Sequence, residues 1–264
     1  LKPKNLFLSA FAIFGLLPLL VNFSYVNQSD QFTFEDYTKA ILNSVEKNSI
    51  IFSYQWDYFI SASYYFQYSD NYRKDVAVID KELLRRSWYF NQLRRSHPDV
   101  IDNINYEVKQ FLEALKPFER SENFNSNLLE ARYREVMTNL VSKNSNRNFY
   151  IGLELFANEM QKGEFSLPKG YQIVPHLLLF KAVQGNEYMP APDADFVIRF
   201  SENENRYTQF IKDTIGRMLS YRILYEINWN KIDKATAYYK KLRTLVPEFE
   251  IPDQIKKVMD PLIK

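Results

Sequence analysis

The sequence contains no cysteine, only six glycines and only two histidines. Without cysteine there can be no disulfide and no thiolate metal site. The two histidines, His97 and His176, are far apart in the sequence, so we expect neither a metal nor a cofactor. Too little glycine is present for a phosphate-binding loop, and no GxxxxGK[ST], GxGxxG, GxSxG or HExxH motif occurs. The common nucleotide-binding and hydrolase classes are therefore excluded.

The sequence also lacks an excess of charge of either sign. Lysine and arginine total 34 against 32 aspartates and glutamates, which leaves a net charge of +2. A field that weak does not favour nucleic acid as a partner. By contrast, 46% of the 264 residues are hydrophobic, and phenylalanine and tyrosine are abundant at 21 and 19. A chain of this length and composition can bury a large core.

The first 29 residues predict a membrane-spanning helix. No charged side chain occurs between Asn5 and Ser29, and the run from Leu6 to Val26 has about the 20 residues that cross a bilayer. Lys2 and Lys4 precede the run, so the positive-inside bias predicts an extracytoplasmic location for the residues that follow. The alternative is a signal peptide, but no small-x-small cleavage site follows the run.

Residues 30–200 predict an α/β domain with a Rossmann-like, partly parallel sheet and extra helices. Apolar β-forming runs at 49–56 and 75–80 are each followed by a helical period, which is typical of a βαβ unit with parallel strands. Further strands are expected at 148–155, at 171–183 with a break near Pro175, and as an edge strand at 196–200. Pro98 is expected to open a helix that runs to Leu115.

Residues 201–264 predict a C-terminal helical hairpin. Apolar residues recur at helical spacing through 207–229 and again through 232–246, and Pro247 ends the second run. The size of this hairpin is similar to one tetratricopeptide repeat, but a single copy is a weak signal, and a pair of core-packing helices is favoured. We expect the hairpin to dock onto the α/β domain.

The carboxyl ends of the first two predicted strands carry the candidate ligand-binding residues. Asp57 follows the first strand beside Trp56, and Asp80 ends the second strand, with Glu82 and Arg85 one turn further on. Open α/β sheets place ligands at this edge, and carboxylates with an arginine and an aromatic ring can hold a sugar. The alternative is that Asp57 and Asp80 cap helices and bind nothing.

Four segments of the chain carry a resemblance to a known family: SVEKNSIIFSYQWDYFISASYYFQY, RKDVAVIDKELLRRSWYFNQL, NFYIGLELF and GYQIVPHLLLF. In these the chain resembles, over most of residues 22–247, the soluble tail of a bacterial family of multi-spanning membrane proteins. That family looks like a relative of the lipid-sugar-dependent O-mannosyltransferases of the GT-C class, one of which, from animals, ends in tetratricopeptide repeats. Many members follow the first strand with a Gly-Asp-Asn-Asp-Thr turn, whereas only Asp57 is acidic here.

The resemblance implies that the parent protein transfers a sugar from a polyprenyl phosphate carrier. It also implies that the catalytic acid lies in the membrane part, upstream of Leu1, so this chain itself is expected to have no catalytic residues. Its expected role is an extracytoplasmic accessory domain that positions a glycan or protein acceptor, or a partner. The alternative is a non-enzymatic envelope scaffold that binds proteins through the helical hairpin.

Overall fold

The computed structural model describes residues 3–201 and 205–262, and within the first helix it leaves the side chains of residues 3–10, 12 and 24 undescribed. The α-helices are α1 (Pro3–Val26), α2 (Thr33–Ser44), α3 (Ser61–Tyr68), α4 (Ser87–Ser96), α5 (Pro98–Asp102), α6 (Asn105–Glu119), α7 (Ser126–Ser142), α8 (Leu153–Leu155), α9 (Arg206–Asn228), α10 (Ile232–Leu245) and α11 (Asp253–Met259). The strands are β1 (Ile50–Ser53), β2 (Ala77–Asp80), β3 (Phe149–Ile151), β4 (Tyr171–His176) and β5 (Leu179–Gln184). Short turns of π-helix form η1 (Trp56–Ile60) and η3 (Phe156–Met160), and turns of 3₁₀-helix form η2 (Leu83–Arg85) and η4 (Asp260–Leu262).

The five strands form one mixed sheet in the order β2-β1-β3-β5-β4. β1 lies between β2 and β3 and is parallel to both, while β5 is antiparallel to β3 and to β4. All residues of β1 and β2 are buried, as expected for parallel strands that are covered on both faces. The predicted α/β architecture with a partly parallel sheet is confirmed.

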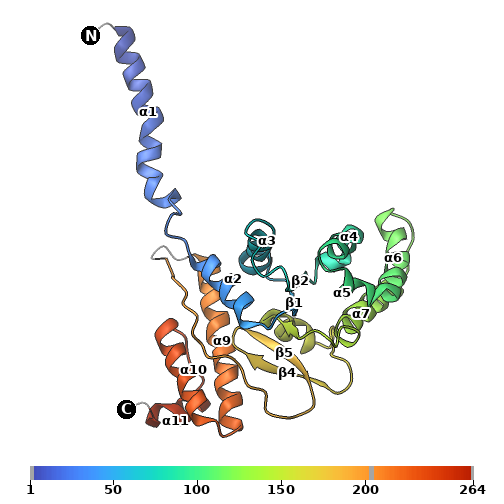
Figure 1. Ribbon diagram of the computed structural model, residues 1–264. Coiled ribbons are helices and arrows are strands. Elements are labelled where there is room, and N and C mark those ends of the chain that lie inside the picture. The colour runs from blue at the N-terminus through green and yellow to red at the C-terminus, as the bar shows by residue number, and fades with distance from the viewer. Residues whose placement is uncertain (1–2, 202–204, 263–264) are drawn as a thin grey trace.

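Two hydrophobic cores lie on the two faces of this sheet. Alternate residues of β1 point to opposite faces: Ile51 belongs to the core that contains α2, α9 and α10, and Phe52 belongs to the core that contains α4 to α7. Figure 1 shows α2 and α9 on one side of the strands and α4, α6 and α7 on the other. The domain is therefore a three-layer structure with the sheet in the middle.

The N-terminal element of the predicted fold class needs correction. α1 is helical and extends away from the rest of the chain (Figure 1), but no helix in the described part of the chain is long and apolar enough to cross a membrane. The membrane-spanning helix predicted from Leu6 to Val26 is not supported.

Other predicted boundaries also shift. The edge strand predicted at 196–200 does not form, because the backbone amide of Arg199 donates to the Asp36 carboxylate of α2 at 2.9 Å instead of joining the sheet. Pro175 does not break its strand: it lies within β4 opposite Phe180, and the turn of the hairpin comes two residues later at Leu177, whose φ is +50°. The helix predicted from Pro98 is divided into α5 and α6.

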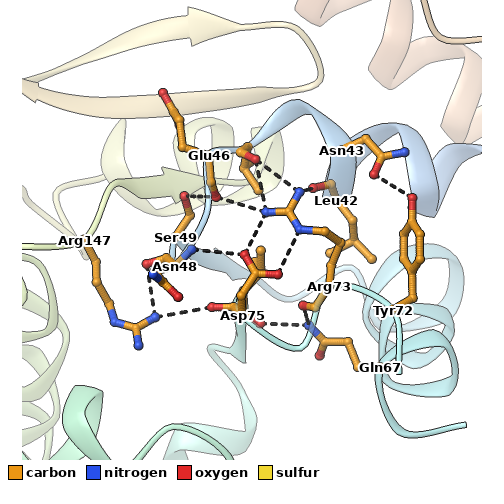
Figure 2. Close-up of polar contacts among 12 residues, drawn as sticks. Leu42, Asn43, Glu46, Asn48, Ser49, Gln67, Tyr72, Arg73, Asp75 and Arg147 are labelled. Atoms are coloured by element: carbon orange, nitrogen blue, oxygen red, sulfur yellow. Dashed lines mark hydrogen bonds and ion pairs between the residues drawn. The ribbon is translucent and has the colours of Figure 1, made fainter. Parts of the chain in front are cut away.

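Arg73 ties the amino-terminal edge of the sheet to the end of α2 (Figure 2). Its guanidinium donates to the carbonyl oxygens of Leu42, Val45 and Glu46, the last at 3.0 Å, and pairs with the Asp75 carboxylate at 3.0 Å. The Leu42 carbonyl belongs to the last turn of the helix and the other two follow it, where no intrahelical donor is left for them. A cation at this end also interacts favourably with the helix dipole. Arg73 therefore holds α2 at the starts of β1 and β2.

The C-terminal hairpin, α9 and α10, is docked on the sheet through a fully buried ion pair. Arg222 and Glu226 of α9 have no exposed side-chain surface and lie 2.5 Å apart. The Arg222 guanidinium also donates to the carbonyls of Pro175 in β4, at 2.7 Å, and Met189, at 3.0 Å. Tyr188 donates to Glu226 at 3.0 Å. The helix, the sheet and the 185–195 segment thus meet at one buried charge pair, and docking of the hairpin is confirmed.

We predict that Arg73→Ala lowers the free energy of unfolding by about 2 to 4 kcal/mol, because three carbonyl groups and the Asp75 carboxylate lose their donor. Urea denaturation measures the change. Lys74→Ala is the matched control, because Lys74 is the next residue in the chain and its side chain is exposed. Equal stability of the two variants would show that Arg73 does not hold α2 in place.

We predict that Arg222→Met costs about 3 to 5 kcal/mol, because it leaves the Glu226 carboxylate buried without its cation. The double variant Arg222→Met/Glu226→Leu is expected to regain a large part of that loss. Arg217→Met removes an exposed ion pair with Asp213 on the same helix and is expected to change stability by less than about 1 kcal/mol. A double variant less stable than Arg222→Met would contradict the explanation that the loss comes from the unpaired Glu226 carboxylate.

Candidate functional site

The carboxyl ends of β1 and β3 lie side by side at the point where the chain changes direction across the sheet. From β1 the chain crosses to β2 on one side, and from β2 it returns to β3 on the other side of β1. Open α/β sheets bind ligands in the crevice at such a switch point. This is the position at which a ligand site is expected from topology alone.

One carboxylate, that of Glu154, occupies this position. Its Oε1 accepts from the Ser53 hydroxyl at 2.7 Å and from the Tyr54 backbone amide at 3.0 Å, and its Oε2 accepts from the Gln55 side chain at 2.5 Å. All three donors come from the end of β1, whereas Glu154 follows β3. We call these four residues the switch-point cluster, and it joins the ends of the two parallel strands.

Local backbone geometry directs Glu154 toward β1. Gly152 comes directly after β3, and its amide donates to the Phe52 carbonyl at 2.9 Å. A Cβ atom at Gly152 would collide with the Glu154 carboxylate, so only glycine leaves room for the side chain to fold back. Burial raises the pKa of Glu154, while the hydrogen bonds from Ser53, Tyr54 and Gln55 act in the opposite direction. The carboxylate is thus held by three donors from the end of β1.

Lys81 forms a second polar group beside the cluster. Its ammonium lies 2.8 Å from a Glu82 carboxylate oxygen and 3.0 Å from one of Glu159 in η3, and it lies over the Tyr54 ring. Burial lowers the pKa of Lys81, but the hydrogen bonds to the two glutamates outweigh this effect and raise it. Asn158 donates to the Tyr54 hydroxyl at 2.7 Å. The ends of β1 and β2 are thereby connected to η3 by paired groups.

The structure places Asp80 as the cap of a turn. Asp80 is only 2% exposed, and its carboxylate accepts from the Leu83 amide at 2.9 Å. Burial raises its pKa, against the effect of that hydrogen bond. Its own amide donates to the Tyr89 hydroxyl at 3.0 Å. Of the two explanations offered by the sequence for Asp80, capping is therefore the one observed.

The other four predicted ligand residues make separate contacts. Trp56 and Asp57 are exposed, and no hydrogen bond to Asp57 occurs among the described residues. Asp57 is not a cap, because η1 begins one residue earlier and has no side-chain cap. Glu82 pairs with Lys81. Arg85 pairs with Glu130 of α7 at 3.0 Å, and its guanidinium stacks on the Tyr133 ring. Among the described residues, no hydrogen bond, ion pair or ring contact joins Trp56 or Asp57 to Asp80, Glu82 or Arg85. That these five residues bind a sugar stays a prediction.

The arrangement therefore fits a structural lock better than a reactive centre. A general base needs a lone pair that can reach a substrate proton, whereas the Glu154 oxygens already accept three hydrogen bonds. Lys81 is similarly occupied by two carboxylates. In the described part of the chain, no group of three or more histidine, aspartate or glutamate side chains is placed to hold a metal ion.

We predict that Asp80→Ala lowers the free energy of unfolding by about 0.5 to 2 kcal/mol through loss of the cap. Asp57→Ala is the control and is expected to leave stability unchanged, because its carboxylate is exposed. Urea midpoints of the two variants provide the comparison. A loss at Asp57 as large as that at Asp80 would show that Asp57 makes a structural contact.

Comparison with known proteins gives one family match. The model of the family described as TMEM260-associated domain 2 matches residues 34–241, which span α2 through most of α10. No curated protein matches the chain. No solved structure matches it either.

Proposed function

The chain belongs to the family described as TMEM260-associated domain 2, and from that premise we propose that it is an accessory domain of a membrane glycosyltransferase. In this proposal the whole protein transfers a sugar from a polyprenyl phosphate carrier, in the manner of the GT-C O-mannosyltransferases that the sequence resembles. The domain acts on the extracytoplasmic side, where it positions the acceptor or a partner protein and supplies no reacting group.

The observation that carries this proposal is the closure of the switch point by Glu154. In an α/β enzyme the carboxyl edge is where reacting groups face the substrate. Here the edge is filled by a carboxylate that bonds to the neighbouring strand and by a lysine between two glutamates. A domain whose topological ligand position is closed in this way is suited to binding through its outer surfaces.

The alternative, a non-enzymatic scaffold that binds proteins through the hairpin, has less support. The inner face of the hairpin is used within the chain: Ala235, Tyr238 and Leu242 of α10 are buried in the same core as the sheet. Tyr238 also donates to the Pro192 carbonyl at 2.7 Å. A single repeat that is covered in this way has no free concave surface for a partner.

A transfer assay with the whole protein tests the proposal. We predict that Glu154→Gln leaves kcat with a polyprenyl-phosphate-linked mannose donor within about 3-fold of the wild type at saturating acceptor. Loss of a general acid or base lowers the rate by about 100-fold or more. Such a loss, at unchanged melting temperature, would make Glu154 catalytic and contradict the accessory role. Transfer that is undiminished in membranes lacking the protein would favour the scaffold.

A further inference from the structure

A cavity of about 560 Å³ is lined by residues of α3 and α4. Its volume lies within the range of small-molecule sites, about 300 to 1,000 Å³. It is separate from the switch-point cluster and from the residues that the sequence singled out as ligands. Its lining residues are Tyr68, Trp88, Asn91, Gln92, Arg95 and Ser96.

Two aromatic rings from different helices border the cavity. Tyr68 of α3 is 55% exposed and Trp88 of α4 is 53% exposed, so both keep free ring surface. The helices that carry them are held together, because the hydroxyls of Tyr64 and Tyr89 form a hydrogen bond of 2.7 Å. Tyr64 also packs against Tyr68, with ring centroids 6.0 Å apart. The two exposed rings are therefore carried by a fixed framework.

The polar side chains of the cavity are available to a ligand. Five lining residues of α4 occur at positions i, i+3, i+4, i+7 and i+8 and so share one face of the helix. On this face the side-chain amides of Asn91 and Gln92 and the Arg95 guanidinium have no hydrogen-bond or ion-pair partner among the described residues. No carboxylate lines the cavity. It therefore offers amide groups and one unpaired positive charge between two aromatic rings.

We propose that this cavity binds an oligosaccharide that contains an acidic sugar. The C–H face of a pyranose ring is weakly positive and packs on the electron-rich face of an aromatic ring. Sugar hydroxyls both donate and accept, which suits the two amides, and Arg95 suits a sugar carboxylate. An apolar peptide would leave the amides without partners. The inference rests on this chemistry and not on the proposed transferase role.

The proposal is tested by titrating the whole chain with tetragalacturonate, with tetramannuronate and with neutral mannotetraose. Binding is measured from the NMR chemical shifts of the α3 and α4 backbone amides. We expect an acidic tetrasaccharide to bind with a Kd on the order of 0.1 to 1 mM. Trp88→Ala and Tyr68→Ala are each expected to weaken binding at least about 10-fold. Arg95→Gln is expected to weaken the acidic sugar by about 10-fold and leave the neutral sugar unaffected.

The matched controls are Tyr65→Ala, an exposed tyrosine on the same helix as Tyr68, and Trp229→Ala, an exposed tryptophan at the C-terminal end of α9 outside the cavity. Both are expected to bind like the wild type. No binding of either acidic sugar up to about 10 mM, or unchanged binding by both Trp88→Ala and Arg95→Gln, would overturn the proposal. Binding to vesicles of anionic phospholipid that is lost in Trp88→Ala would overturn it in favour of a membrane-facing surface.

Discussion

A partly buried carboxylate joins the ends of two parallel strands, and the account of this domain depends on it. Glu154 follows β3, yet its hydrogen-bond donors come from Ser53, Tyr54 and Gln55 at the end of β1. Burying a charge without partners is costly, so the three donors are needed for the carboxylate to be there at all. The same donors occupy its oxygens. One interaction thus fixes the strand ends and closes the crevice that the topology would otherwise offer to a ligand.

Charged side chains also hold the opposite edge of the sheet and the C-terminal hairpin, but there they are arginines that donate to backbone carbonyls of distant segments. Arg73 collects carbonyls after α2, and Arg222 collects those of Pro175 and Met189. Glu46 adds a third link, because it pairs with Lys181 of β5 at 2.7 Å. Guanidinium groups present several donors in a fixed plane, which suits this task.

Much of the fold could be predicted from the sequence because buried parallel strands are short apolar runs followed by helical periods. This pattern placed β1 and β2 and implied their parallel pairing, and Asp80 was correctly offered as a cap. Glu154 was missed because the apolar run NFYIGLEL reads as one strand, whereas the backbone leaves the sheet at Gly152. The partners of a side chain beyond that point come from another strand, and no local spacing reveals them.

Arg222 illustrates the same limit. Helical spacing predicted a helix through 207–229, but not that Arg222 is buried in it, where its charge is paired with Glu226 and with two carbonyls that lie 33 or more residues away. The spanning helix predicted from Leu6 to Val26 is not supported for a different reason, because no helix in the described part of the chain is long and apolar enough to cross a membrane. Likewise, the cavity requires that Tyr68 of α3 and Trp88 of α4 come together although β2 separates them in the sequence, which only the three-dimensional arrangement shows.

Hydrogen exchange of the Tyr54 backbone amide tests the central claim most directly, because this amide donates to the Glu154 carboxylate rather than to another strand. If Glu154 locks β1 to β3, the Tyr54 amide exchanges only when the whole domain unfolds, with the same free energy as the amide of Gly152. Exchange of Tyr54 about 100-fold faster than that of Gly152, through a local opening, would contradict the lock and leave the switch point free for a ligand.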